Sequence, residues 1–492
     1  MILSIDQGTT GTTVLVLSPH GEILGRGYSE FQQIFPQPGW VSHNASEIWD
    51  TTLKVIGIAI ADAGITSSEL KGIGITNQRE TTVIWDRKTG EPVHDAIVWQ
   101  CRRTSDLCDT YIKDGLEDTV RSKTGLVIDA YFSATKIVWL LDHVDGLRER
   151  AERGEVCFGT IDSFLLYKLT GGTIHATEYT NASRTMIYNI HTKDWDSELL
   201  KIFNIPAEIL PEVKPSSGDF GTTANLDVLP AGIPISGIAG DQQAALFGQR
   251  GVNVGDIKNT YGTGCFTLFQ TGDQAIPSKQ GLLTTLACDP FGQVSYALEG
   301  GVFSAGSAVQ WLRDGLGIIE TAAETEPLAQ SIDDTGGVYL VPAFTGLGAP
   351  HWNANARGTI VGITRGTQRA HLARAALESI AYQSADLVQA MTADAQQPVA
   401  SLRVDGGAVV NDFLMQFQAD ILNVPVIRPK YVETTAVGAG MLAGLATGVW
   451  KSPDELININ PPDHTFEPDM SQDQREALMA GWHKAIRQSL SE

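Results

Sequence analysis

The chain has 492 residues, 42% of them hydrophobic, and a formal net charge of −22 at pH 7. This length predicts two or three domains, each large enough to bury a core. The negative charge argues against nucleic acid and anionic membranes as partners, so an anionic ligand would need local backbone donors, a metal and a few basic residues. No apolar run approaches the roughly 20 residues of a membrane span. Because the first residues also lack the basic flank of a signal peptide, we expect a cytoplasmic protein without membrane insertion.

The cysteines and glycines exclude further classes of protein. The five cysteines are scattered and form no CxxC pair, which argues against a disulfide framework and against a zinc site and predicts reduced thiols. The 50 glycines exceed the roughly 7% of an average chain and follow no collagen period. They mark turns, some of which are expected to serve ligands.

The first half of the chain begins with strand patterns at residues 2–6, 12–17 and 22–31, separated by short turns. These three strands predict a meander. A helical pattern over 46–63 and a strand at 72–76 follow, and helices and strands then alternate to about residue 245. Such alternation is typical of an α/β sheet.

The pattern then restarts. Residues 257–269 repeat the apolar strand, Gly/Thr turn and apolar strand of residues 2–16. A helical pattern at 370–391 again precedes a strand, at 402–405. This is a weak internal duplication, visible in pattern more than in identity.

The duplication predicts two similar α/β domains, residues 1–248 and 249–492, with a ligand cleft between them. The tail after residue 452 is rich in Pro and Asp and then helical from 472 to 490. We assign no function to it.

Three Gly-rich turns follow predicted strands, at residues 6–12, 261–264 and 405–408. Glycines let the backbone approach phosphate oxygens, threonines add hydroxyl donors, and a strand-end carboxylate such as Asp6 can hold magnesium through water. None of the three is a Walker A loop. A single turn of this kind is more often a plain hairpin, but two at matching positions of duplicated domains favour a phosphate site.

Two further segments place polar side chains at strand ends. Residues 76–82, Thr-Asn-Gln-Arg-Glu-Thr-Thr, follow an apolar strand, and such a run is ordinarily a solvated loop. Asp241 ends another apolar strand, where open α/β sheets bind ligands. Because Asp is also a common helix N-cap, residue types alone leave a ligand-binding and a capping role open for Asp241.

Taken together, these segments resemble the FGGY carbohydrate kinase family. The resemblance covers nearly the whole chain, through residues 6–10, 74–82, 99–104, 180–185, 240–248, 259–266, 342–350 and 404–408. It implies the actin-like (ribonuclease H-like) ATPase fold in two copies, in agreement with the restart near residue 250. It also implies phosphorylation of glycerol to sn-glycerol 3-phosphate by ATP with Mg²⁺, in glycerol catabolism, by a homo-oligomer that is a dimer or tetramer.

Carried over position by position, the resemblance implies an acceptor site with polar partners for glycerol and an aromatic wall. The polar partners are Arg79, Glu80, Tyr131, Asp241 and Gln242, and the wall is formed by Trp99 and Phe266. Such a pocket would select a small polyol from water and from larger sugars. Asp241 is expected to be the general base.

For the nucleotide, the resemblance implies contacts from the turns of both halves. The phosphate set is Thr9, Thr10, Gly11, Thr263, Gly306 and Gln310; Gly407 and Asn411 lie near the adenosine, and Asp6 lies near the metal. Phosphoryl transfer depends on aligning donor and acceptor and on stabilising charge on the transferred oxygens. A closing cleft would provide both and would exclude water.

The chain departs from the family pattern at two places. Thr13 stands where an Arg usually follows the first turn. Phosphate binding then relies more on magnesium and backbone donors, or another basic residue takes over. Residues 222–232 contain neither the Arg of the fructose 1,6-bisphosphate element nor the histidine of phosphorelay activation, so we expect neither control.

Three other functions compete with this one. A pentulose, ribitol or gluconate kinase is disfavoured because the Arg79–Glu80 pair and Trp99 leave little room for five carbons. A chaperone or filament ATPase with the actin-like fold would leave the polar clusters around Arg79 and Asp241 unexplained. A catalytically weak sensor is suggested only by Thr13.

Overall fold

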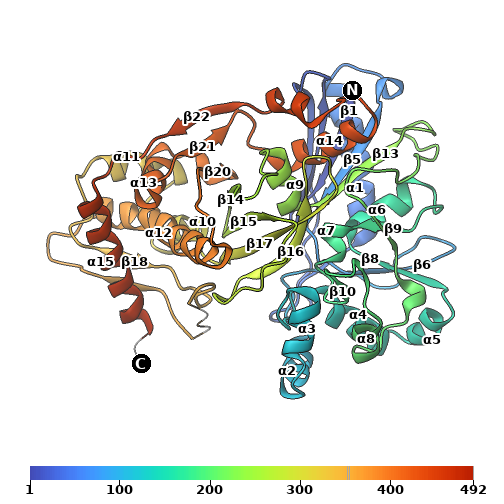
Figure 1. Ribbon diagram of the computed structural model, residues 1–492, viewed down its shortest axis with the longest axis horizontal. Helices are drawn as coiled ribbons and strands as arrows, with labels where there is room; N and C mark the ends of the chain where they lie inside the picture. The colour runs from blue at the N-terminus through green and yellow to red at the C-terminus, as the bar shows by residue number, and fades with distance from the viewer. Residues whose placement is uncertain (352, 354, 491–492) are drawn as a thin grey trace.

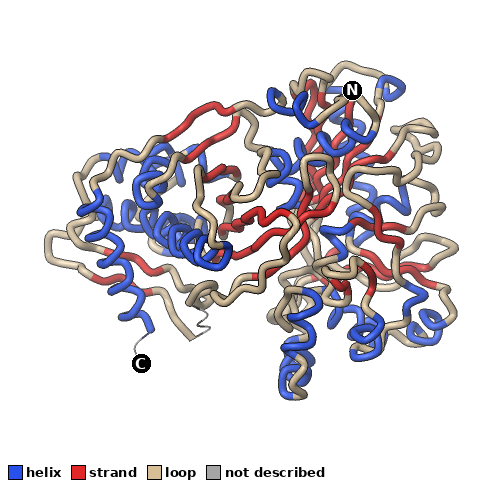
Figure 2. The backbone as a smooth tube through the Cα atoms, viewed as in Figure 1, coloured by secondary structure: helices blue, strands red, loops and turns tan. Residues whose placement is uncertain are grey.

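The computed structural model describes residues 1–351, 353 and 355–490. Two mixed β-sheets form its frame, one in each half of the chain, and helices cover them (Figures 1 and 2). Short two-stranded pairs lie outside these sheets: β4 (Ser42–His43) with β7 (Ala96–Ile97), β6 (Val83–Asp86) with β8 (Val156–Gly159), β9 (Ala176–Glu178) with β12 (Glu212–Lys214), β10 (Tyr188–Asn189) with β11 (Asp194–Trp195), and β18 (Tyr339–Val341) with β19 (Thr359–Val361).

The N-terminal sheet has five strands in the order β13-β5-β1-β2-β3. Its strands are β1 (Ile2–Gln7), β2 (Gly11–Leu17), β3 (Ile23–Glu30), β5 (Gly72–Asn77) and β13 (Ile235–Gly240). The first three form the predicted antiparallel meander, and β5 and β13 run parallel to β1. The carboxyl ends of β1, β5 and β13 therefore lie at one edge of the sheet.

The C-terminal sheet has seven strands in the order β16-β17-β15-β14-β20-β21-β22. Its strands are β14 (Ile257–Tyr261), β15 (Cys265–Gly272), β16 (Leu283–Cys288), β17 (Val294–Val302), β20 (Leu402–Asp405), β21 (Val426–Pro429) and β22 (Pro462–Phe466). Strands β14, β15, β17, β20 and β21 repeat the order and directions of β1, β2, β3, β5 and β13. The predicted duplication of the fold is confirmed, with β16 and β22 added at the edges.

The helices follow the same repeat, because α1 connects β3 to β5 and α12 connects β17 to β20. Asn44 caps α1 by accepting hydrogen bonds from the backbone of Ser46 and Glu47. The predicted helices 46–63, 370–391 and 472–490 correspond to α1, α12 and α15. The helices are α1 (Ala45–Asp62), α2 (Ser105–Lys113), α3 (Glu117–Thr124), α4 (Ser133–His143), α5 (Leu147–Glu152), α6 (Ile161–Leu169), α7 (Tyr179–Ala182), α8 (Ser197–Ile202), α9 (Asp241–Gly248), α10 (Gly306–Gln310), α11 (Thr325–Gln330), α12 (Arg369–Ala395), α13 (Asp412–Leu422), α14 (Thr434–Ala446) and α15 (Gln472–Leu490).

Two helices join the halves of the molecule. Helix α14 comes late in the chain but packs on β1, β5 and β13 of the N-terminal sheet, whereas α9 packs against α14 and reaches β14 and β15 (Figure 1). A side chain at Gly438 would collide with the backbone of Ala244, so the two helices touch through their backbones. This contact brings the carboxyl ends of the N-terminal sheet against the C-terminal sheet.

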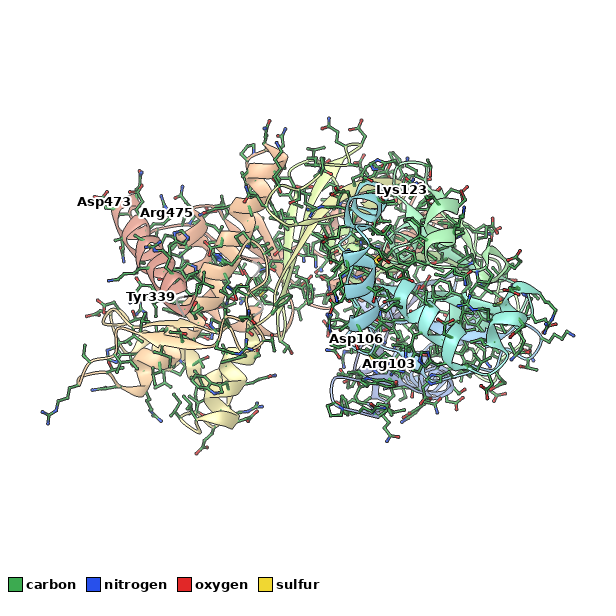
Figure 3. All side chains as sticks on the ribbon, turned by 90° about the horizontal axis from the view of Figure 1, so that it is seen from below. Arg103, Asp106, Lys123, Tyr339, Asp473 and Arg475 are labelled. Atoms are coloured by element: carbon green, nitrogen blue, oxygen red, sulfur yellow. The ribbon has the colours of Figure 1, made fainter. Side chains whose placement is uncertain are left out.

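Figure 3 shows the two lobes from below, with Arg103, Asp106 and Lys123 on the N-terminal lobe and Tyr339, Asp473 and Arg475 on the other. All five cysteines are buried free thiols. Among residues 1–351, 353 and 355–490, no helix combines the length and the apolar content needed to cross a membrane.

Candidate active site

The residues expected to bind the acceptor lie at the carboxyl ends of β5 and β13. These parallel neighbours pair Asn77 with Gly240, so the residues that follow them meet. Arg79 Nε lies 3.0 Å from Asp241 Oδ1. Arg79 has φ 59°, a left-handed conformation that is uncommon for a residue other than glycine and that recurs at functional sites.

A closed ring of alternating charges holds Arg79 in place. The Arg79 guanidinium donates to both carboxylate oxygens of Glu299, at 2.7 and 3.0 Å. Arg184 donates to Glu299 at 3.0 Å and to Glu80 at 2.7 Å. Arg79 and Glu80 complete the ring at 3.8 Å. Burial alone would raise the pKa of Glu299, but the charges of Arg184 and Arg79 outweigh it and lower the pKa to about 2.

The ring leaves buried polar atoms without partners. Within the described residues, Glu80 Oε2 and Arg184 Nη1 are buried and make no hydrogen bond. Buried polar groups are almost always hydrogen-bonded, so an unpaired acceptor and an unpaired donor on two residues that pair with each other are consistent with a site for a polar ligand. The interpretation of residues 76–82 as a solvated loop is wrong, because all seven are buried.

Three aromatic rings surround these groups. The Tyr131 hydroxyl accepts from Arg79 at 3.1 Å. The Trp99 ring meets Tyr131 edge-on with centroids 5.5 Å apart and meets Phe266 at 6.4 Å. The resulting enclosure combines polar partners with an apolar wall, as the family resemblance implied.

Asp241 is the accessible carboxylate of the three that pair with Arg79. Its side chain is 29% exposed, against 1% for Glu80 and 3% for Glu299. The N-cap of α9 is Gly240, and Asp241 is the first residue of the helix. The capping interpretation of Asp241 is therefore wrong, although its Oδ1 does accept from the backbone of Gln242 at 2.7 Å.

Gln242 is oriented by a buried lysine. Lys258 Nζ, on β14, donates to Gln242 Oε1 at 2.5 Å and to Thr260 Oγ1 at 2.8 Å. An ammonium group only donates, so the Gln242 atom that it contacts is the carbonyl oxygen, and the amide NH₂ of Gln242 is directed elsewhere. Lys258 also links the acceptor side to the turn that follows Thr260.

The first Gly-rich turn touches the acceptor pocket. Trp99 Nε1 donates to Thr9 Oγ1 at 2.9 Å, and Gly8 N donates to Gly11 O at 2.9 Å to close the turn. Thr10 is exposed on this turn. Asp6 stands at its base, where burial, followed by the charges of Asp241 and Glu433, raises the Asp6 pKa to about 7.

The second turn, residues 261–264, carries Thr263 and is joined to α10. The backbone of Gly306 donates to Gly262 O at 3.0 Å, and Ser307 N donates to Thr263 O at 3.1 Å. A side chain on Gly306 would lie 2.5 Å from Gly262 O, so this approach requires glycine. Gln310 ends α10 with an exposed side chain.

The third turn contacts the second. Gly406 has φ 91°, and a side chain there would lie 2.5 Å from Tyr261 O. Gly407 is exposed with open space beside its Cα, and Asn411 caps α13 by accepting from Leu414 N at 2.9 Å. The structure thus gathers the acceptor residues and the first turn at one place and gathers the C-terminal turns beside β14.

Three charged residues of this site were missed in the sequence: Arg184, Lys258 and Glu299. Lys258 is the one charged residue of β14, Glu299 is the one charged residue of β17, and Glu299 is followed by two glycines. A buried charge is costly unless it is paired, so an isolated charge in a core strand is a signal that could have found them.

Comparison with known proteins identifies the family. The sequence profile of the FGGY family of carbohydrate kinases matches in both parts, the N-terminal domain over residues 1–248 and the C-terminal domain over residues 257–447. The chain belongs to the FGGY family of carbohydrate kinases. The resemblance stated from the sequence is confirmed, and so is the predicted fold.

Individual relatives of this FGGY kinase match over nearly its full length. Glycerol kinase 2 of Thermotoga maritima is 57% identical over 489 residues, which cover 99% of this chain and 98% of that protein. Glycerol kinase of Deinococcus radiodurans is 58% identical over 485 residues, with 99% and 96% covered. The crystal structure of Plasmodium falciparum glycerol kinase with ADP superposes with a TM-score of 0.94 at 37% identity and covers 100% of this chain and 98% of that one.

Proposed function

We propose that this FGGY kinase transfers the terminal phosphoryl group of ATP to a terminal hydroxyl of glycerol, giving sn-glycerol 3-phosphate and ADP, with Asp241 as general base. The relatives named glycerol kinase support the substrate. The observation that carries the assignment of the base is accessibility. Of the three carboxylates paired with Arg79, Asp241 has by far the most exposed side chain, which suits the group that must take up and later release a proton.

The residues of the site support this chemistry at each step. Glu80, Arg79, Tyr131 and the Gln242 amide hold the hydroxyls of the acceptor, and Trp99 and Phe266 cover its carbon edge. The hydroxyl oxygen forms a bond to the γ-phosphorus as the bond from that phosphorus to the β–γ bridging oxygen breaks. The hydroxyl proton passes to Asp241, and ADP leaves with the electron pair.

The first turn and the acceptor pocket share a contact, from Trp99 to Thr9, that supports close placement of donor and acceptor. In this proposal Thr9, Thr10, Gly11, Thr263, Gly306 and Gln310 bind the phosphates, and Gly407 and Asn411 bind the adenosine. The exposed backbone groups of these turns are suited to the role because they need no side-chain movement to donate.

Asp6 suits a magnesium ion. Mg²⁺ keeps several waters and needs only one or two protein carboxylates beside the phosphates, and Asp6 is a strand-end carboxylate that lies close enough to Asp241 to feel its charge. When bound, the ion would neutralise charge on the phosphate oxygens.

A coupled ADP-release assay with and without glycerol tests the proposal. We expect ADP formation that depends on glycerol, and weaker turnover with xylulose, ribitol and gluconate, because the Arg79–Glu80 pair and Trp99 are expected to leave little room for five carbons. ATP hydrolysis that ignores every acceptor would refute the proposal and favour an ATPase of the chaperone or filament type. Preferential turnover of a five-carbon acceptor would refute the substrate assignment alone.

A further inference from the structure

The first phosphate turn lacks a cation of its own. The stretch from Gln7 through Thr13 contains no basic residue. Its surroundings are acidic, because Asp6 directly precedes it and Glu30 pairs with Gly11 on the neighbouring strand. A polyphosphate brought to this turn would meet like charges that must be offset.

The sheet register places one arginine close to this turn. Thr13 pairs with Asp6 on β1 and with Tyr28 on β3, and Leu15 pairs with Arg26. Residues directly opposite each other, or two apart along a strand, point to the same face, so Asp6, Thr13, Tyr28 and Arg26 share one face of the sheet. Arg26 is the diagonal neighbour of Thr13, about 7–8 Å away, which an arginine side chain can span.

Tyr28 connects Arg26 to the turn. The Tyr28 hydroxyl donates to Glu30 Oε1 at 3.4 Å, and a side chain on Gly11 would lie 2.9 Å from that hydroxyl. The Arg26 guanidinium carbon lies 5.8 Å from the centroid of the Tyr28 ring. Because residue 11 is glycine, the Tyr28 ring can pack against the turn. Arg26 in turn lies against the Tyr28 ring.

Arg26 differs from the other cations of the junction in being available. Arg79, Arg184 and Lys258 are buried and bound to protein acceptors. The Arg26 side chain is 49% exposed, and its partner is Glu433 of the C-terminal half, with Nε 3.3 Å from Oε1. An exposed ion pair of this kind is weak, so a phosphate can displace the carboxylate.

We propose that Arg26 is a nucleotide-phosphate-binding residue, held beside the first turn by Tyr28, and that it supplies the positive charge that Thr13 cannot. This inference rests on the proposed function, because it takes the first turn to be the phosphate site. On nucleotide binding the guanidinium leaves Glu433 and donates to phosphate oxygens, for which its planar fork is suited.

The test removes the positive charge at position 26 and then restores it at position 13. Arg26→Val removes it and suits an exposed strand position, and we expect the KM for ATP to rise by about 10-fold or more while the KM for glycerol stays unchanged. Arg26→Lys should retain part of the affinity. Adding Thr13→Arg to the Arg26→Val variant should bring the KM for ATP back towards the parent value.

The control is Arg153→Val, which removes another exposed arginine, 57% exposed and 2.7 Å from Glu155, and should change neither KM. An unchanged KM for ATP in Arg26→Val would overturn the inference. So would a raised KM that neither Arg26→Lys nor Thr13→Arg relieves, because that pattern marks a structural role. Calorimetric titration of each variant with ADP measures nucleotide binding without an acceptor. It therefore distinguishes failure of the Arg26 inference from failure of the proposed function.

Discussion

The proposed acceptor side and the proposed nucleotide side of this site are built in different ways. On the acceptor side, Arg79, Glu80, Arg184 and Glu299 are at most 3% exposed and satisfy one another's charges before any ligand is present. On the nucleotide side, residues 261–264 and 406–408 present glycines and backbone groups, and Gly262, Thr263 and Gly407 are exposed. The acceptor side consists of paired charged side chains in the interior, whereas the nucleotide side consists of backbone groups exposed at the surface.

This difference predicts unequal sensitivity to substitution. Removing one member of a buried charge network leaves the others unneutralised in a medium of low dielectric, which is expensive. Removing one side chain near a backbone turn leaves the turn in place. Substitutions on the acceptor side should therefore have the larger effects.

The largest effect is expected from Asp241→Asn. Asn keeps the shape and loses the basicity, and general-base assistance typically contributes about 10²–10⁴-fold. The turnover number should fall by at least about a hundredfold, with nucleotide affinity unchanged and glycerol binding weakened less. Steady-state kinetics and calorimetric titration with ADP measure these quantities.

A position-matched control is Asp412→Asn, which changes the first residue of α13 in the same way as Asp241 is the first residue of α9. It should leave turnover unchanged. If Asp241→Asn keeps more than about a tenth of the parent turnover, Asp241 is not the base, because general-base loss costs at least about 10²-fold.

Glu299→Gln should have the next largest effect. It removes the carboxylate that two buried guanidinium groups share and leaves them only Glu80 and Asp241 as counter-charges. Breaking a buried ion pair from one side typically costs about 3–5 kcal/mol of stability. Because Arg79 loses its bidentate partner, the KM for glycerol should rise by roughly 10-fold or more. The double variant Arg184→Met/Glu299→Met removes one charge of each sign and should recover most of the thermal stability.

The double variant separates positioning from folding. Its KM for glycerol should stay raised although its melting temperature approaches that of the parent. A parent-like KM for glycerol in this variant would show that the ring serves stability alone.

The charge ring was not predictable from the sequence, whereas much of the fold was. The meander of residues 2–31, the restart at 257 and helix α12 followed from periodicity and turn residues, which are local signals. Resemblance then supplied Arg79, Glu80 and Asp241. Arg184 and Glu299 are separated by 115 positions in the chain, and their contact depends on how the segment after α7 meets β17, which no local pattern contains. The burial of residues 76–82 was missed for the same reason, because their partners come from distant segments.

A smaller effect is expected from Asp6, on the nucleotide side. Its folded-state pKa is raised from 3.8 to about 7, so the folded protein favours the protonated form. The stability that this group contributes is present below its unfolded pKa and is lost as pH rises through 7. Asp6→Asn mimics the protonated carboxyl and should raise the melting temperature at pH 8, on the order of 2 °C, and by less at pH 5, where only part of that stability has been lost.

Scanning calorimetry at the two pH values measures the Asp6 effect, and kinetics at varied Mg²⁺ should show weaker use of MgATP by the same variant. An equal change in melting temperature at pH 5 and pH 8 would mean that the carboxyl does not titrate in this range.

The smallest effect is expected from fructose 1,6-bisphosphate, which should leave activity unchanged at millimolar concentration. Residues 222–232 have neither a basic side chain nor a glycine-rich turn that could bind an anion. They contain no basic residue, and the Thr223 side chain is used within the loop, where it donates to Pro230 O at 2.7 Å and accepts from Ile233 N at 3.0 Å. A bisphosphate brings two multiply charged groups to a protein of net charge −22, so without a local cation its binding is unfavourable. Initial rates with the bisphosphate are compared with rates at the same ionic strength in sulfate, which removes non-specific screening. Saturable inhibition beyond the sulfate control would contradict this prediction. It would reveal a second anion site, built from backbone groups, in a loop without a glycine cluster.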